Sequence, residues 1–140
     1  MKICAGVLAY NAEIIIEASL KSIENYVDHI FVINGSALGP STDKTAKIAE
    51  SVGKKVEVIS GMFDNKLKQR QVYLDLMIKD DNNWCILHDS DEVWRKDFIE
   101  KLINYILEAS LETKAFGYSP INFYKDYHHI ISGGSWDKPR

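Results

Sequence analysis

The sequence lacks long hydrophobic runs and an excess of basic residues. No apolar run approaches the ~20 residues that a membrane-spanning helix needs. The run from Ile3 to Ala9 is too short for a signal peptide and is cut off by Asn11. The net charge is −3, whereas non-specific nucleic-acid binding needs a basic face. We therefore expect a cytoplasmic protein with no membrane span and no nucleic-acid partner.

Cysteine is also scarce. The sequence contains two cysteines, Cys4 and Cys85, and each lies inside an apolar, strand-like segment. Two such thiols do not suggest a disulfide framework in a chain of 140 residues, and their spacing matches no metal knuckle. We expect both thiols to be buried and reduced.

Two nucleotide-binding signatures are missing as well. No G-x-x-x-x-G-K-[ST] segment is present, which excludes a simple phosphate-loop ATPase. Nucleotidyltransferases on related sheets usually open with a glycine-rich, basic loop after the first strand. Here that loop reads AYNAEIII, residues 9–16, with neither glycine nor a basic residue. A nucleotidyltransferase is therefore a disfavoured interpretation.

The sequence does contain a regular alternation of strand-like and helix-like segments. Near-continuous apolar runs are typical of strands covered on both faces, and apolar residues spaced by three and four indicate helices. The clearest helical repeat spans residues 97–108. The predicted strands cover residues 2–10, 29–34, 55–60 and 84–88, and the predicted helices cover residues 12–26, 42–52, 66–78 and 97–108.

Local patterns add detail to two of these helices. Ser41 or Thr42 is suited to cap the second helix, because a hydroxyl oxygen can accept a hydrogen bond from a free N–H group of the first turn. Apolar spacing predicts the buried side of the third helix. The residues expected on that side are Leu67, Gln71, Leu74 and Ile78.

The order βαβαβαβα predicts an α/β fold, Rossmann-like, with a mostly parallel sheet, right-handed crossovers and helices on both faces. Ligands of such sheets bind beyond the carboxyl ends of the strands, where the strand order reverses. If the third, second and first strands are neighbours and the fourth packs beyond the first, residues 9–11 face residues 88–89 across that point. Side chains alternate along a strand, so His88 is expected to point away from Asp89 and into the core.

Three acidic residues follow the fourth predicted strand in ILHDSDEVW, residues 86–94. Carboxylates are the hard ligands that Mg²⁺ and Mn²⁺ prefer, and one or two of them plus substrate phosphates can hold Mg²⁺. Asp89 and Asp91 are therefore candidate metal ligands, in a site that would neutralise charge on a departing diphosphate. Asp and Ser also favour turns and helix caps, so a purely structural turn explains the same residues. Composition and spacing leave both interpretations open.

The order of the motifs resembles the N-terminal, nucleotide-binding half of a family-two glycosyltransferase with the GT-A fold. Each motif is weak alone, but four of them in order on a βαβ frame are fairly specific. In two places the sequence departs from the family pattern: Asn34 stands where an aspartate usually reads the uracil ring, and ALGP lengthens the loop that follows. The matched segments are VLAYNAE (7–13), INGSALGPSTDKTAKIAE (33–50), KQRQ (68–71) and ILHDSDEVW (86–94).

The resemblance implies a nucleotide-sugar site. Asp89 and Asp91 would hold the metal and the diphosphate, and Arg70 would lie near the nucleotide or its phosphates. Inverting members also use a carboxylate base further along the chain, for which Asp126 and Asp137 are the available candidates, and the base stays unassigned. The substrate-binding residues implied in this way are Ala9, Tyr10, Asn11, Glu13, Asn34, Gly35, Ser36, Arg70, Asp89 and Ser90.

The resemblance thus implies a glycosyltransferase that uses Mn²⁺ or Mg²⁺ and transfers a sugar, with inversion, from a UDP-linked or other nucleotide-diphosphate donor to an unidentified acceptor. Within a single domain, residues 1–110 would form the donor-binding core and residues 111–140 the start of the acceptor side. The alternative is a non-catalytic nucleotide-binding or assembly module with a GT-A-like half-domain. Association into a homo-oligomer stays open in both interpretations.

Overall fold

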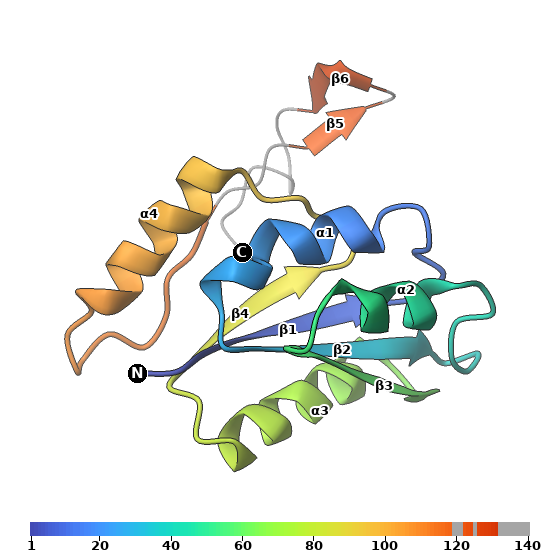
Figure 1. The fold of residues 1–140 in the computed structure, drawn as a ribbon, viewed down its shortest axis with the longest axis horizontal. Coiled ribbons are helices and arrows are strands. Elements are labelled where there is room, and N and C mark those ends of the chain that lie inside the picture. Colours follow the sequence, from blue (N-terminus) through green and yellow to red (C-terminus); the bar gives the residue numbers. More distant parts are fainter. Residues whose placement is uncertain (119–121, 125, 132–140) are drawn as a thin grey trace. The chain divides into compact units, whose positions relative to one another are not determined.

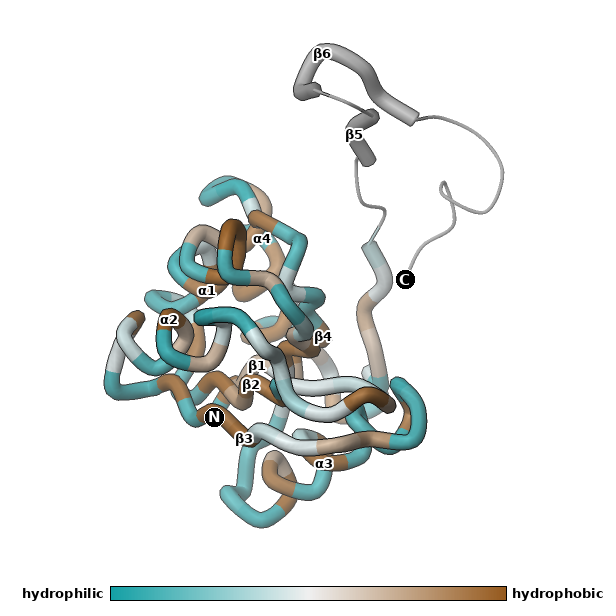
Figure 2. The backbone as a smooth tube through the Cα atoms, turned by 90° about the vertical axis from the view of Figure 1, so that its right-hand side faces the viewer, coloured by the Kyte–Doolittle hydropathy of each residue, from teal (hydrophilic) through white to brown (hydrophobic). Residues whose placement is uncertain are grey.

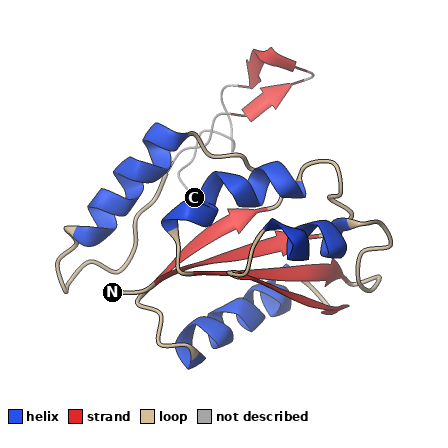
Figure 3. Ribbon diagram, in the orientation of Figure 1, coloured by secondary structure: helices blue, strands red, loops and turns tan. Residues whose placement is uncertain are grey.

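The computed structural model describes residues 1–118, 122–124 and 126–131. It contains two compact units, Met1–Leu107 and Glu108–Arg140. The described part of the second unit holds a short antiparallel pair, β5 (Asn122–Tyr124) and β6 (Asp126–Ile131). The first unit holds the main sheet and all the helices of the described residues (Figure 3).

The main sheet has four parallel strands in the order β3-β2-β1-β4. This is the order that the sequence-based placement of the site assumed, and it puts the point of reversal between β1 and β4. The strands are β1 (Ile3–Ala9), β2 (His29–Ser36), β3 (Val56–Met62) and β4 (Trp84–Asp89).

Helices cover both faces of this sheet, as predicted. In Figure 1, α1 and α2 lie over one face and α3 lies over the opposite face. The first helix begins later than expected, because residues 12–15 form a turn in which Ile15 N–H donates to Ala12 O. The helices are α1 (Ile16–Ile23), the 3-10 helix η1 (Glu24–Tyr26), α2 (Thr45–Val52), α3 (Lys66–Lys79) and α4 (Lys96–Leu107).

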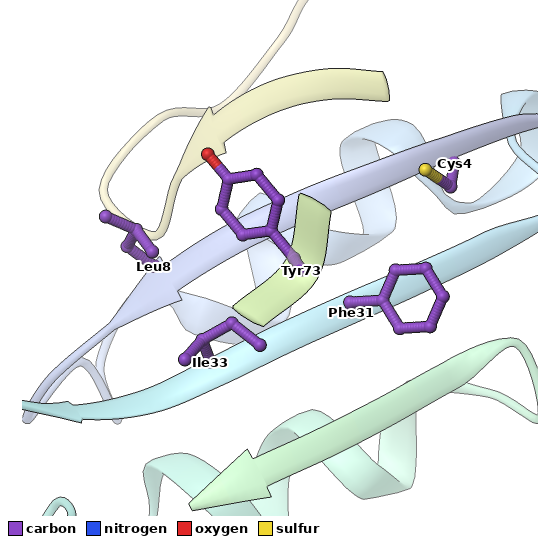
Figure 4. Close-up of a cluster of buried hydrophobic side chains, with 5 residues drawn as sticks. All are labelled: Cys4, Leu8, Phe31, Ile33 and Tyr73. Atoms are coloured by element: carbon purple, nitrogen blue, oxygen red, sulfur yellow. The ribbon is translucent and has the colours of Figure 1, made fainter. Parts of the chain in front are cut away.

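The core lies on both sides of β1 and β2. All seven residues of β1 are buried, which explains its near-continuous apolar sequence. Figure 2 shows the apolar segments of these central strands between α1 and α2 on one side and α3 on the other. On the α3 side, the ring of Tyr73 lies across β1, between Cys4 and Phe31 at one end and Leu8 and Ile33 at the other (Figure 4).

The predicted buried side of α3 is wrong for Leu67, Gln71 and Ile78, whereas Leu74 is partly buried and packs against the core. Leu67 and Ile78 are 75% and 74% exposed, whereas Gln69 and Tyr73 are buried. The side-chain amide of Gln69 donates to Ile33 O at 2.7 Å and to Gly35 O at 3.0 Å, so it satisfies carbonyl groups at the end of β2. A glutamine that pairs with backbone groups can be buried at little cost, and this contact rotates the helix away from its most apolar stripe.

Asn65 caps the start of α3, where its Oδ1 accepts a hydrogen bond from Lys68 N–H at 2.9 Å. Asn65→Ala is expected to lower the free energy of unfolding by about 1 kcal/mol, because one N–H group of the first turn loses its partner. Urea unfolding followed by circular dichroism measures this change. Asn65→Asp keeps an acceptor and is the control, so equal losses in both variants would contradict the capping role.

Candidate functional site

The acidic turn is fastened to the end of β1. Asp89 is the last residue of β4 and the register partner of Leu8 on β1. The next residue, Ser90, donates its N–H to Leu8 O at 3.1 Å. Glu92 N–H then donates to Asp89 O at 3.0 Å, which closes a turn. The acids therefore lie beside the last residues of β1, at the carboxyl edge of the sheet where ligands of such folds bind.

Asp89 faces α3 and meets a positive charge from that helix. A terminal nitrogen of Arg70 lies 3.8 Å from Asp89 Oδ1, and both side chains are partly exposed. The hydroxyl of Tyr73 interacts with Arg70 as well. Burial raises the pKa of Tyr73 to about 12, although the positive charge of Arg70 acts to lower it. The phenol is therefore neutral at physiological pH. Asp91 lies at the turn and is exposed.

Asn11 joins the end of β1 to the loop after β2. Its N–H donates to Ser41 Oγ at 2.8 Å, and its Oδ1 accepts from Thr42 N–H at 2.9 Å. Its φ of 48° lies in the left-handed region, which asparagine adopts more readily than most residues. The Ser41 hydroxyl donates to Asn34 Oδ1, and Asn34 Nδ2 donates to Ser60 Oγ at 2.9 Å. Asn34 is 1% exposed, so its polar atoms serve this network rather than open solvent.

A second set of hydrogen bonds continues this connection. Ala12 N–H donates to Thr45 Oγ1 at 2.7 Å, and Glu13 N–H donates to Asp43 Oδ2 at 3.1 Å. In return, Glu13 Oε2 accepts from Lys44 N–H at 3.0 Å. The cap predicted at Ser41 or Thr42 is wrong, because α2 begins at Thr45 and the earlier residues hold the β1 loop instead.

His88 is buried, as predicted, and ties the acidic turn to α1. Its Nε2 lies 2.8 Å from Ser19 Oγ, and its Nδ1 lies 3.6 Å from Glu92 Oε2. The same carboxylate oxygen accepts from Trp94 Nε1 at 3.3 Å, and the rings of His88 and Trp94 meet edge to face. The order of the three groups, a hydroxyl, an imidazole and a carboxylate, resembles a nucleophile–base–acid triad. Ser19 is 0% exposed, however, so no substrate reaches it and the arrangement is structural.

Burial lowers the pKa of His88 to about 4, so the ring is neutral at pH 7. The unfolded chain takes up this proton near pH 6.5, before the folded chain does. The stabilisation is therefore complete above pH 6.5 and is lost as the pH falls through the folded pKa. At about 1.4 kcal/mol for each pKa unit, the total is about 3 kcal/mol.

This shift predicts a fall in the free energy of unfolding between pH 6.5 and about 4. Urea unfolding at several pH values, compared between wild type and His88→Gln, isolates the effect, because glutamine can still pair with Ser19 and does not titrate. The difference between the two curves is expected to change by about 3 kcal/mol over this interval. A difference that is constant with pH would contradict the buried, neutral imidazole.

The structure brings most of the predicted site residues to one edge of the sheet. Ala9, Tyr10, Asn11 and Glu13 lie at or beyond the end of β1, with Tyr10 37% exposed. Asp126 is the first residue of β6 in the second unit, and Asp137 lies outside the described residues. The end of β2 contributes Asn34, Gly35 and Ser36, and α3 contributes Arg70. The acidic turn contributes Asp89, Ser90 and Asp91.

The carboxylates of this edge fit a cation that is shared with a ligand. Within the described residues, no group of three or more His, Cys, Asp or Glu side chains is placed to hold a metal ion. Asp89 and Asp91 each carry carboxylate oxygens, the hard donors that Mg²⁺ prefers, while the Glu92 carboxylate accepts a hydrogen bond from Trp94. Two carboxylates completed by phosphate oxygens and water are a normal donor set for Mg²⁺. The donor set therefore fits Mg²⁺ or Mn²⁺ bound together with a diphosphate.

Comparison with known proteins decides the family. The model described as Glycosyl transferase family 2 matches residues 4–134. The chain belongs to this family. A protein of Rickettsia bellii (strain RML369-C) described as "Uncharacterized glycosyltransferase" is 30% identical over 117 residues, which cover 84% of this chain and 36% of that protein. The family assignment confirms the resemblance seen in the four sequence motifs.

The structural comparison shows the fold of this glycosyltransferase-family chain. The crystal structure of S. aureus TarS 1-349 matches with a TM-score of 0.59 and 20% identity, over 85% of this chain and 39% of the chain in that structure. The match confirms the predicted α/β, Rossmann-like GT-A fold. The chain spans little more than a third of the length of either relative. Among the described residues, no helix is both long and apolar enough to cross a membrane.

Several residues that shape the site were missed in the sequence. Ser19, Ser60 and Gln69 are polar residues inside otherwise apolar or periodic segments, and each pairs with a partner distant in sequence. Asp43 and Thr45 lie in the predicted helix 42–52 and in the matched segment 33–50, but their hydrogen bonds to the loop after β1 were not predicted. A search for polar residues on the apolar face of the first predicted helix would have found Ser19, whereas Gln69 lies off the predicted buried side of the third helix.

Proposed function

We propose that this chain binds a nucleotide-diphosphate sugar at the carboxyl ends of β1 and β4, for transfer of the sugar to an acceptor. The observation that carries the proposal is the attachment of the acidic turn to β1 by the hydrogen bond from Ser90 N–H to Leu8 O, in a chain of the glycosyltransferase family. That bond supports placing Asp89 and Asp91 beside Tyr10, so one ligand can span both segments.

In this proposal, Asp89 and Asp91 hold Mn²⁺ or Mg²⁺ together with the diphosphate. When bound, the cation neutralises the charge that develops on the leaving diphosphate. Arg70 exchanges its contact with Asp89 for a phosphate oxygen, because a guanidinium pairs well with phosphate. Tyr10 offers an exposed aromatic ring to the base.

The loop residues act through the network that they form. Asn11 and Glu13 hold the loop after β2 against the end of β1, and Asn34 orients the Ser41 hydroxyl within it. We assign these residues to the shape of the nucleotide pocket, with Gly35 and Ser36 contributing their backbone. Three parts of the proposal rest on family membership. They are uridine as the nucleoside of the donor, inversion at the anomeric carbon, and a role for Asp126 or Asp137 as the general base.

Titration calorimetry tests the binding step. UDP is titrated into the full chain with and without Mn²⁺, and Mn²⁺ is expected to raise UDP affinity by about 10- to 100-fold. Coupling between two ligands is reciprocal, so UDP must raise the affinity for Mn²⁺ by the same factor. Equal UDP affinity with and without the metal would contradict the shared site.

A turnover assay separates the two functional interpretations. Release of UDP from a UDP-sugar by this chain would exclude a module that only binds nucleotide. Metal-dependent UDP binding without any release, over a panel of UDP-sugars and with simple sugar acceptors, would favour the binding module.

A further inference from the structure

Cys4 and Cys85 lie side by side beneath α3. They are register partners on the parallel strands β1 and β4. Cys4 belongs to the buried cluster around Tyr73 (Figure 4), and Cys85 packs against that cluster, so both side chains lie on the same face of the sheet. Neighbouring strands are about 4.8 Å apart, and a disulfide joins Cα atoms about 4.4–6.8 Å apart. The backbone therefore already holds the two residues at a distance that a disulfide can span.

The two thiols differ in access. Cys4 is on the inner strand β1 and is 0% exposed, whereas Cys85 is on β4, the last strand in the sheet order, and is partly exposed. Leu87, two residues further along the same face of β4, is 52% exposed. A reagent from solvent therefore reaches Cys85 before it reaches the buried Cys4.

The two thiols also differ in acidity. A hydrogen bond from Cys4 lowers the pKa of Cys85, and the same contact, with burial, raises the pKa of Cys4. Cys85 is thus the thiol that deprotonates more readily, and the thiolate is the nucleophile in disulfide exchange.

We propose that Cys4 and Cys85 form a thiol–disulfide exchange site that reacts with low-molecular-weight disulfides. The Cys85 thiolate attacks one sulfur of the small disulfide, forms a mixed disulfide and releases the first small thiolate. Cys4 then gives up its proton and attacks the Cys85 sulfur, which forms the Cys4–Cys85 bond and releases the second small thiol. Two protein thiols are oxidised and one small disulfide is reduced to two thiols.

This site is independent of the proposed nucleotide function. It uses neither the acidic turn nor Arg70, and it lies four residues before Leu8 and Asp89 on the two strands. A failure of UDP binding would leave it untouched, and a failure of disulfide exchange would leave UDP binding untouched.

The test exposes the full, folded chain to oxidised glutathione and follows its intact mass. Wild type is expected to lose two hydrogen atoms without keeping a glutathione adduct, and to recover its original mass with dithiothreitol. Peptide mapping is expected to join Cys4 to Cys85. Cys4→Ser is expected to stop at a stable glutathione adduct on Cys85, because the second thiol is missing. Cys85→Ser is expected to react at least about 100-fold more slowly than wild type, because Cys4 becomes accessible only when the core opens.

The wild-type result decides the proposal even if a variant fails to fold. Two reduced thiols after exposure of the native chain, with normal reaction in denaturant, would overturn it. A wild-type chain that stops at a glutathione adduct would also overturn it, because Cys4 would then be out of reach of Cys85. Circular dichroism confirms that each variant is folded, and Cys4→Ala replaces Cys4→Ser if the serine variant is not.

Discussion

Gly6→Ala is expected to lower the free energy of unfolding by about 3 kcal/mol, because it forces a methyl group into the ring of Tyr73. A Cβ atom on Gly6 would lie no more than 2.7 Å from three ring carbons of Tyr73. The ring is 1% exposed and is held between β1 and α3, so it has no open space into which to move. Urea unfolding of the variant measures the loss.

Two further variants separate this clash from a general effect of replacing glycine. At Gly53, an added Cβ would meet the end of the Glu24 side chain, which is flexible and can move aside. Gly53→Ala is therefore expected to change the free energy of unfolding by less than about 1 kcal/mol. In a Tyr73→Ala background the ring is absent, so Gly6→Ala should cost much less than in wild type. Additive effects of the two changes would contradict direct contact between Gly6 and Tyr73.

Asp91→Asn is expected to reduce UDP affinity in the presence of Mn²⁺ by most of the about 10- to 100-fold gain that the metal provides, with little change in its absence. Loss of an outer partner of a metal ligand already costs about 10- to 100-fold, and this change removes a proposed ligand itself. Asp75→Asn, at an exposed position on α3, is the matched control and should bind as wild type does. The measurement is calorimetric titration of each variant with UDP, with and without the metal.

Asp89→Asn has a second expected effect. The carboxylate that lies 3.8 Å from Arg70 loses its charge, so the guanidinium becomes available to phosphate. Without metal, Asp89→Asn should therefore bind UDP at least as tightly as wild type, whereas with Mn²⁺ it should lose the gain that the metal provides. If both asparagine variants kept the full effect of Mn²⁺, the acidic turn would not be the metal site.

The arrangement of the sheet could be predicted because it depends on general rules. The apolar runs around Val7 and Val32 read as strands buried on both faces, and right-handed βαβ connections limit the order in which such strands can lie. Those two rules, together with an assumed strand order, placed the acidic turn next to the end of β1. Alternation along β4 was sufficient to bury His88 and to turn Asp89 to the other face.

The side-chain contacts of the site could not be predicted in the same way. Asn11 meets Ser41 across 30 positions of sequence, and Ser19 meets His88 across 69. Helical spacing on α3 fits more than one stripe, and only the carbonyl groups at the end of β2 select the stripe that contains Gln69. Propensity describes a residue and its neighbours along the chain, whereas these contacts depend on which elements the fold brings together.

The central claim is that Asp89 and Asp91 hold a divalent cation together with a nucleotide diphosphate. The most direct test is an anomalous difference map from crystals of this chain grown with UDP and Mn²⁺. The account predicts a manganese peak at coordination distance from a carboxylate oxygen of Asp89 or Asp91 and from a phosphate oxygen of UDP. Bound UDP with its diphosphate away from the acidic turn, or a manganese peak held by other carboxylates, would contradict the account.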